Sequence, residues 1–482
     1  MFVERDRIPI GDLDDVDFSA YLGKLKPGEH KDPKEALDNL NLALGKIKTF
    51  YEAKDSKSVI KGFNQIVESA SPLMWSYLKE RQQKGDYLSG DQEIFIYTLC
   101  QAANDAARSC QEASNQPKLS KVEKDKTNAL ALFFQEKQIK WGTAMGDDVI
   151  SLRALNNLIQ IGFDRAIRLF YIDGEKEKAR NIIVNEIRNI AGHFNFAKIV
   201  LKTTVGMNTG VEYESALNGR KKTADNELAS LQFMANTLNR WGVLHTTLAE
   251  MHDPVDDPIE QIKQARKVLD EAGRFHLNRV EKRTPRKEFL ERSMAIESNH
   301  AYTYILQANI AENLNSINIV NLSQIMSNIN NHFIKKFLNP MQFLEKETDI
   351  PADKAKRIKD HFTAESITRS IEVLKIMFLA NTSTSTTTNP EYELLERTVF
   401  SGILGYADSL SFFGSAGMDL SKMVEKEYTI LNKKQFFKLA IYLLIGMGEM
   451  HLQNEDSSPD DEDRICFNRT KSDLRKLEFA II

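Results

Sequence analysis

A chain of 482 residues, 42% of them hydrophobic and 27% charged, is long enough to bury one large core or roughly two to three smaller ones. The formal net charge of −4 argues against a surface that binds nucleic acid along its whole length, because such domains carry a clear basic excess. The cysteines Cys100, Cys110 and Cys466 are too few and too scattered for a disulfide framework or a four-cysteine zinc site, which indicates a reducing compartment.

The N-terminal sequence MFVERDRIPIGDLDDVDF has acidic residues where a secretory signal needs a basic start and an apolar run. The most apolar windows, IEVLKIMFLA and FFKLAIYLLIGMG, are shorter than the roughly 20 residues that cross a bilayer, so we expect buried helices and no transmembrane segment. We therefore expect a cytoplasmic protein. A bacterial effector can be delivered into a host cell without a cleaved signal, so that destination stays open.

After an N-terminal extension over residues 1–34, the stretch 41–70 predicts the first pair of helices. Apolar residues recur at spacings of three and four on both sides of the polar Lys54-Asp55-Ser56. This pattern predicts an antiparallel helix hairpin, and Asp55 or Ser56 can accept hydrogen bonds from the first amides of the second helix.

A second hairpin is predicted over residues 152–190, where Asp173-Gly174 separates two helices with apolar periodicity. Ala179 lies just after the break, and its small side chain allows the two helices to cross closely. The same order of helix, polar break and helix recurs in three later pairs of segments, 228–251 with 257–272, 299–315 with 318–333, and 437–452 with 464–480.

Two segments, FYEAKDSKSVIKGFNQIVESA (50–70) and LFYIDGEKEKARNIIVNEI (169–187), share the order aromatic, turn, small or β-branched residue, apolar residue. In this order they resemble tetratricopeptide-type repeats, and the resemblance implies an all-α protein built as an α-solenoid of stacked helix hairpins. The family period of about 34 residues is not kept, because the matching Val59 and Ala179 lie 120 residues apart. A non-repeating multi-helix bundle is the alternative.

Strand patterns are poor, because no run of β-branched and aromatic residues alternates with polar residues between tight turns. Turn-forming segments of low apolar content, at 206–226 and 381–390, are the best candidates for boundaries. They divide the chain into an N-terminal helical repeat region, a central helical region and a C-terminal helical region, at residues 35–205, 227–380 and 390–482.

No motif assigns a catalytic residue or a cofactor. The sequence lacks a phosphate-binding GxxxxGK[ST] loop, a GxSxG turn and an HExxH helix. Glu297 and His300 form one Glu-x-x-His unit, which di-iron bundles use in two copies. A second copy is missing, so we predict a solvent-facing pair and no metal site.

The resemblance implies a protein or peptide partner, bound in a concave groove that the first helices of the hairpins line. In the second hairpin we assign partner binding to Asn156, Asn157, Gln160 and Arg168, because polar residues on an otherwise apolar first helix have no packing role.

Residues 263–292 carry ten Lys and Arg residues against five Asp and Glu residues, in a chain that is acidic overall. This local excess suggests a surface that binds anions, either an acidic protein or anionic lipid headgroups. The residues that we assign to it surround Pro285 and are Lys282, Arg283, Arg286 and Lys287.

The sequence is compatible with three hypotheses on function. The first is a scaffold or adaptor that binds a partner protein in a groove. The second is an enzyme, or a host-directed bacterial effector, with a site assembled from residues distant in sequence. The third is a binder of anionic surfaces. A deep polar pocket with converging Asp, Glu or His would favour the enzyme, whereas an open groove would favour the scaffold.

Overall fold

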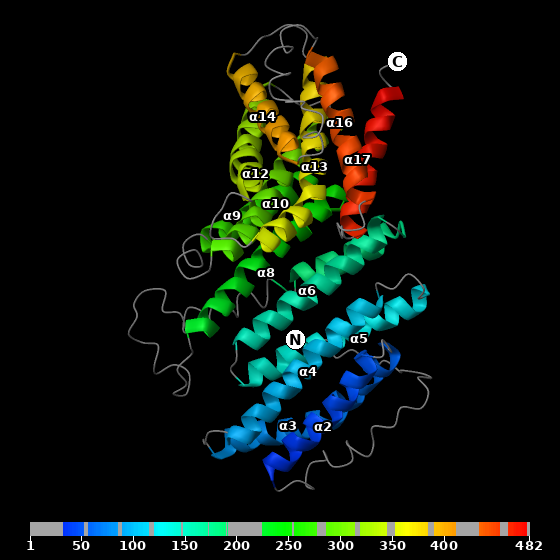
Figure 1. Ribbon diagram of the computed structural model, residues 1–482, viewed down its shortest axis with the longest axis vertical. Coiled ribbons are helices and arrows are strands. Elements are labelled where there is room, and N and C mark those ends of the chain that lie inside the picture. Colours follow the sequence, from blue (N-terminus) through cyan, green and yellow to red (C-terminus); the bar gives the residue numbers. More distant parts are fainter. Residues whose placement is uncertain are drawn as a thin grey trace. The chain divides into compact units, whose positions relative to one another are not determined.

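The computed structural model describes the helical parts of the chain, residues 32–52, 56–84, 89–114, 120–145, 148–171, 173–188, 190, 224–252, 255–276, 286–313, 319–344, 352–383, 390–410, 433–453 and 461–479. Every regular element in these ranges is a helix, and they contain no strand (Figure 1). This confirms the predicted all-α class. Within the same ranges, no helix combines the length and the apolar content needed to cross a membrane.

The chain forms two compact units. The first unit comprises residues 1–169 and 177–237, and the second comprises residues 170–176 and 238–482. Both predicted boundary segments, 206–226 and 381–390, lie mostly outside the described residues.

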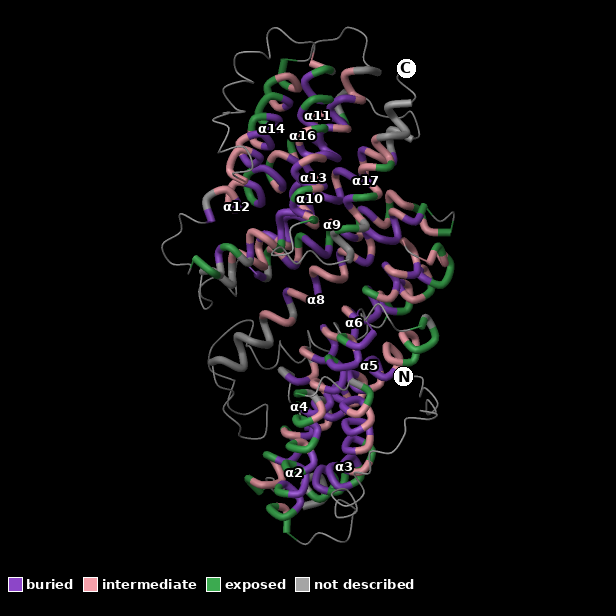
Figure 2. The backbone as a smooth tube through the Cα atoms, turned by 45° about the vertical axis from the view of Figure 1, so that its right-hand side comes forward, coloured by how far each residue is buried: buried purple, intermediate pink, exposed green. Residues whose placement is uncertain are grey.

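Among the described residues, the first unit begins with the helices α2 (Pro33–Glu52), α3 (Ser56–Lys84), α4 (Gly90–Ser114), α5 (Lys121–Met145) and α6 (Asp148–Tyr171), and the last two residues of α6 belong to the second unit. Helices α2 and α3 flank the predicted break at 54–56 and pack against each other, so the first hairpin is confirmed. Helix α4 then packs against α5, and it also contacts α2 and α3. The buried residues lie along the sides on which these helices face one another (Figure 2).

The second predicted hairpin is also present. Helix α6 ends at Tyr171, Gly174 takes a left-handed φ of +67°, which glycine adopts without steric cost, and residues 176–188 form the next helix. The two helices approach closely, because a Cβ atom at Gly162 would lie 2.8 Å from Cγ of Glu186. The break at Asp173-Gly174 is therefore where the sequence predicts it.

Ala179 is fully buried in this hairpin. We expect Ala179→Trp to lower the free energy of unfolding by about 1 to 3 kcal/mol, because a larger side chain in a packed interior displaces its neighbours. Urea unfolding followed by circular dichroism measures the change. Glu177→Trp, at an exposed position two residues earlier, is the matched control and should change stability little. Equal stability of both variants would contradict the predicted close crossing.

Apart from residues 170–176, the second unit starts within α8 (Ala224–Glu250) and continues with α9 (Pro258–Phe275), α10 (Arg286–Asn313), α11 (Ile319–Ile329), the π-helix η3 (Asn330–Leu338) and α12 (Asn339–Phe343). The described part of the chain then continues with α13 (Ala352–Ser383), α14 (Pro390–Ser409), α16 (Lys433–Gln453) and α17 (Asp461–Phe479). The three later pairs of predicted helices are therefore present. Asp257 caps α9 by accepting from the amide of Ile259, as the Asp-Pro sequence predicts.

Helix α13 packs against α10, α14, α16 and α17, whereas η3 packs against α10, α11, α12 and α14. Much of this unit shares one hydrophobic core, to which Phe333, Phe337, Phe400 and Phe437 contribute fully buried rings. Each of these two central helices thus contacts helices that are remote in sequence.

Candidate functional site

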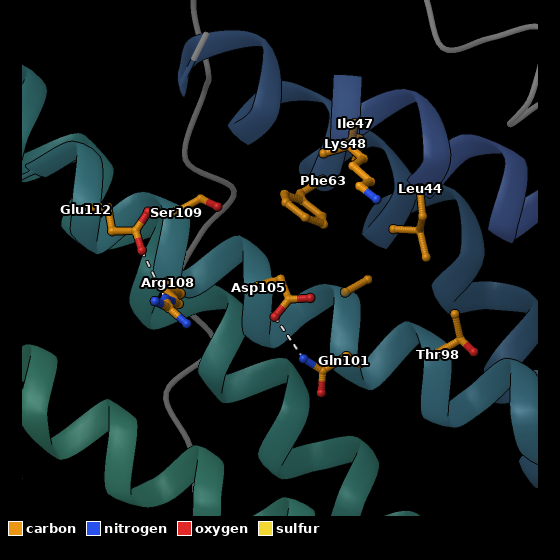
Figure 3. A pocket seen from close by; sticks show the side chains of 11 residues that line it. Leu44, Ile47, Lys48, Phe63, Thr98, Gln101, Asp105, Arg108, Ser109 and Glu112 are labelled. Carbon is orange, nitrogen blue, oxygen red and sulfur yellow. Dashed lines mark hydrogen bonds and ion pairs between the residues drawn. The ribbon is translucent and has the colours of Figure 1, made fainter. Parts of the chain in front are cut away.

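A groove opens on the first unit where α2 lies beside α4 (Figure 3). It has a volume of 470 Å³. Helix α2 contributes Leu44, Ile47 and Lys48 to its lining, α3 contributes Phe63, and α4 contributes the remaining residues, Thr98, Gln101, Ala102, Asp105, Arg108, Ser109 and Glu112. No histidine or cysteine is among these lining residues.

The contribution of α4 follows from its sequence. The lining residues of α4 recur at spacings of three and four between positions 98 and 112, so they share one side of the helix. The opposite side is apolar and buried, with Leu99, Cys100, Ala103 and Ala106 among its residues. Helix α4 therefore packs through one side and presents a polar stripe on the other.

The groove has an apolar floor and a polar rim. Ile47, Phe63 and Ala102 are buried at the floor. On the rim, Gln101 Nε2 donates to Asp105 Oδ1 at 2.8 Å, and Arg108 Nε lies 2.9 Å from Glu112 Oε1 (Figure 3). The Arg108–Glu112 side chains are 75% and 45% exposed, and exposed ion pairs contribute little stability. These rim side chains can therefore rearrange around a bound chain at low cost.

The polar stripe continues from α4 onto α6. Arg153 Nη2 donates to Gln101 Oε1 at 3.3 Å, and Asn157 Nδ2 donates to Asn104 Oδ1 at 3.2 Å. One predicted partner-binding residue, Asn157, is thus joined to the helix that lines the groove. Because Gln101 contacts both Asp105 and Arg153, it links the groove to α6.

The other three predicted partner-binding residues have different environments. Asn156 is buried with 5% of its surface exposed, so it faces the helix packing. Gln160 donates to the carboxylate of Asp164 on its own helix, and Arg168 is half-buried in the last turn of α6. Sequence reasoning missed the stripe on α4, although the polar spacing at 101, 105, 108 and 112 carried the signal.

The predicted anion-binding residues lie at an edge of the described chain. Lys282 and Arg283 are outside the described residues. Arg286 and Lys287 belong to the first turn of α10, but the structure does not describe their side chains. Within the same basic segment, Lys263 is exposed and lies 3.6 Å from Glu260. Lys263 therefore lies on the surface, whereas other cations of the segment belong to the packing between helices.

Arg266 belongs to the packing. Its guanidinium lies 3.7 Å from the ring centroid of Tyr304 and donates to Thr303 Oγ1 at 2.9 Å and to Gln307 Oε1 at 2.7 Å. Burial lowers the pKa of Arg266 to about 10, which still leaves it charged at neutral pH. It therefore joins α9 to α10 and does not add to an open basic surface.

A cluster of histidines and carboxylates lies in the second unit, where α9, α10 and η3 meet. His300 Nε2 donates to Asp270 Oδ1 at 3.0 Å, and His332 Nδ1 donates to Glu297 Oε2 at 2.6 Å. The two imidazole rings stack with centroids 4.0 Å apart and an interplanar angle of 16°. The predicted solvent-facing Glu297–His300 pair is therefore wrong, because both residues are buried by the π-helix and α9.

Electrostatics keeps both carboxylates of this cluster ionised. Burial opposes ionisation of Glu297, but His332 and Lys336 outweigh it and hold its pKa below the ordinary value. The hydrogen bond from His300 likewise lowers the pKa of Asp270. Burial lowers the pKa of His300, so its imidazole is neutral at neutral pH.

This histidine cluster is poorly placed for chemistry on a substrate. The side chains of His300 and His332 are only 5% and 12% exposed. Among the described residues, no group of three or more His, Cys, Asp or Glu side chains could hold a metal ion. The cluster is suited to joining three helices.

A second buried network of the second unit, which we call the Glu250 cluster, joins the last residues of α6 and α8, Tyr171 and Glu250, to the middle of α10 and of α17. The hydroxyls of Tyr171 and Tyr302 both donate to the carboxylate of Glu250. Arg469 Nη1 lies 2.8 Å from Glu250 Oε2 and donates to the hydroxyl of Tyr171 at 2.7 Å. The guanidinium of Arg369, on α13, lies 3.3 Å from the ring centroid of Tyr302.

In the Glu250 cluster the carboxylate is ionised and both tyrosine hydroxyls are neutral. Burial opposes ionisation of Glu250, but Arg469 and the two tyrosine hydroxyls outweigh it, so the pKa of Glu250 lies below its ordinary value. Burial and the neighbouring Glu250 raise the pKa of Tyr171 and of Tyr302 well above 10.0. Both tyrosines are therefore neutral hydrogen-bond donors at any physiological pH.

Comparison with known proteins does not extend these assignments. No protein-family model matches the sequence, and no curated protein is similar to it.

Proposed function

We propose that the protein is a helical-repeat scaffold or adaptor, and that its first unit binds a segment of a partner protein in the groove where α2 lies beside α4. One observation carries the proposal: the groove is lined mainly by α2 and α4, which are the first helices of two successive hairpins. A stack of antiparallel hairpins presents its concave binding surface on its first helices.

The order of contacts in the first unit supports a stack. The first helices contact one another in turn, since α2 packs against α4 and α4 is hydrogen-bonded to α6. Each is also followed by its own antiparallel partner, α3, α5 and the helix over 176–188. We propose a short α-solenoid for this unit, and the alternative, a non-repeating bundle, for the second unit around α13 and η3.

The chemistry of the groove points to a peptide ligand. Its buried floor of Ile47, Phe63 and Ala102 suits apolar side chains. Its rim offers the amide of Gln101 and the carboxylate of Asp105, which can donate to and accept from a peptide backbone. Because the volume of 470 Å³ is at the small end for ligand sites, we expect one or two anchoring side chains in it, with the rest of the segment along the rim.

The enzyme hypothesis has less support. The groove lining contains no histidine, and the imidazoles of the histidine cluster are almost fully buried, whereas catalytic groups need to reach a substrate. None of the three cysteines forms a disulfide, which is consistent with a reducing cytoplasm. We propose that the protein acts in the cytoplasm, either of the cell that makes it or of a host cell.

The experiment is a selection of binding peptides from a random display library, with the full-length protein as bait, followed by affinity measurements on Gln101→Trp. Gln101 is exposed on the rim, so an indole there covers the floor without disturbing the core. We expect the selected peptides to bind Gln101→Trp at least tenfold more weakly than the unchanged protein, as measured by fluorescence anisotropy.

Glu68→Trp is the matched control, because Glu68 is exposed on α3 and does not line the groove. It should bind the selected peptides with unchanged affinity. If peptides are selected and bind Gln101→Trp as tightly as they bind the control, the groove is not their site and the proposal is contradicted.

A further inference from the structure

We propose that the stacked imidazoles of His300 and His332 form a pH-sensitive latch, which holds the π-helix η3 against α10 at neutral pH and releases it on acidification. The two rings come from different elements, α10 and η3, and their centroids are 4.0 Å apart. Each ring is held by its own carboxylate, Asp270 for His300 and Glu297 for His332. Nothing in the proposed partner binding by the first unit requires this device.

The two ring nitrogens of His300 differ in their surroundings. Its Nε2 is bonded to Asp270, whereas its Nδ1 is buried and has no hydrogen-bond partner among the described residues. In the neutral imidazole Nδ1 carries no proton, so the missing partner costs little. Protonation would create a buried donor without an acceptor as well as a buried charge, and both are unfavourable.

The stacked neighbour, His332, makes a second charge still less favourable. Positive charge on both stacked rings would place two cations at van der Waals distance, and like charges at that separation repel strongly in a partly buried site. The ring of Tyr304 lies next to both imidazoles, with its centroid 5.6 Å from that of His300 and 5.9 Å from that of His332. Water therefore has limited access to screen charges on the two imidazoles. The stack is therefore compatible with at most one imidazolium.

The surrounding charges do not offset a second imidazolium. On α9, Asp270 is near the cations Arg266 and Arg274. On α10, Glu297 is shared between His332 and Lys336, with Lys336 Nζ at 3.2 Å from Glu297 Oε1. The two carboxylates thus already face three cations before either histidine is protonated.

The element that the latch holds departs from α-helical geometry. η3 is a π-helix, and π-helices are rare and frequently mark functional positions. Because the pKa of His300 is held below its usual value by burial, the folded state binds fewer protons than the unfolded state below about pH 6.5. The neutral imidazole of His300 therefore contributes to the stability of the folded state above that pH, and this contribution is lost as the pH falls below it.

The test is hydrogen exchange with mass spectrometry on the full-length protein at pH 7.5 and pH 5.5, corrected for intrinsic exchange rates. We expect protection of residues 330–338 to fall at least tenfold at the lower pH, while protection of α4 changes less than twofold. The variant His300→Gln keeps a donor toward Asp270 and cannot gain a proton. In this variant, the protection of residues 330–338 should differ by less than twofold between the two pH values.

His245→Gln is the matched control. His245 contacts Gln261 at 2.7 Å and burial lowers its pKa too, but it lies outside the stack, so this variant should keep the full response to pH. Proton titration of the histidine ring signals in the unchanged protein gives an independent readout if His300→Gln fails to fold. Equal protection of 330–338 at both pH values, an unchanged response in His300→Gln, or independent titration of His300 near pH 6.5 would each overturn the proposal.

Discussion

Arg469→Met is expected to lower the free energy of unfolding of the second unit by about 3 kcal/mol, because removing one partner of a buried ion pair leaves the other uncompensated. In the Glu250 cluster the side chain of Glu250 is only 10% exposed, and Arg469 is its cationic partner at 2.8 Å. Tyr171 and Tyr302 can still donate to the carboxylate, which limits the loss. Urea unfolding of the full-length protein, followed by circular dichroism, measures it.

Two further variants separate charge from packing. Arg108→Met breaks an ion pair that is 75% and 45% exposed, so its stability should change by less than about 0.5 kcal/mol. Adding Glu250→Gln to Arg469→Met removes the uncompensated charge and should recover part of the lost stability. If Arg469→Met is as stable as Arg108→Met, the Glu250 cluster does not hold these helices together.

Phe400→Ala is expected to cost about 3 to 5 kcal/mol, the usual range when a buried aromatic side chain is removed from a core. Phe400 is 1% exposed on α14, and its ring meets those of Phe436 and Phe437 edge-on at centroid distances of 5.6 and 5.2 Å. The truncation therefore removes contacts between α14 and α16. The melting temperature by circular dichroism or calorimetry reports the loss.

Leu394→Ala is the control on the same helix, because Leu394 is 69% exposed. It should leave the melting temperature nearly unchanged, since little apolar area is buried there. Similar losses in both variants would mean that the register of α14 against its neighbours is different from the one described.

The helices and their breaks could be predicted from the sequence because both are local properties. Apolar residues at spacings of three and four identify α2, α3 and α6, and Asp173-Gly174 identifies the turn that Gly174 makes with a positive φ. Asp257 before Pro258 identifies the start of α9. In each case the signal lies within a few residues of the feature it specifies.

The buried polar clusters could not be predicted, because their partners are far apart along the chain. His332 lies 35 residues from Glu297, and Arg469 lies 298 residues from Tyr171. Helical periodicity places Glu297 and His300 on one side of α10, but it does not say what covers that side. The prediction of a solvent-facing pair failed because η3 and α9 cover it.

Less of the candidate site could be predicted. The sequence identifies α2 as the first helix of a hairpin, but it did not identify the pair α4 and α5, so the groove of 470 Å³ between α2 and α4 was not predicted. The choice of residues on α6 was less informative, since Asn156 turns inward while Asn157 bonds to Asn104 of α4. The spacing of polar residues on a helix shows which of them share a side, but not which side faces the neighbouring hairpin.

Hydrogen exchange of the full-length protein with and without a selected peptide tests the proposed binding function most directly. Binding in the groove should slow exchange in α2 around residues 44–48 and in α4 along residues 98–112, and should leave α9 and the basic segment 263–292 unchanged. Protection confined to 263–292, or to any part of the second unit, would contradict the proposed function.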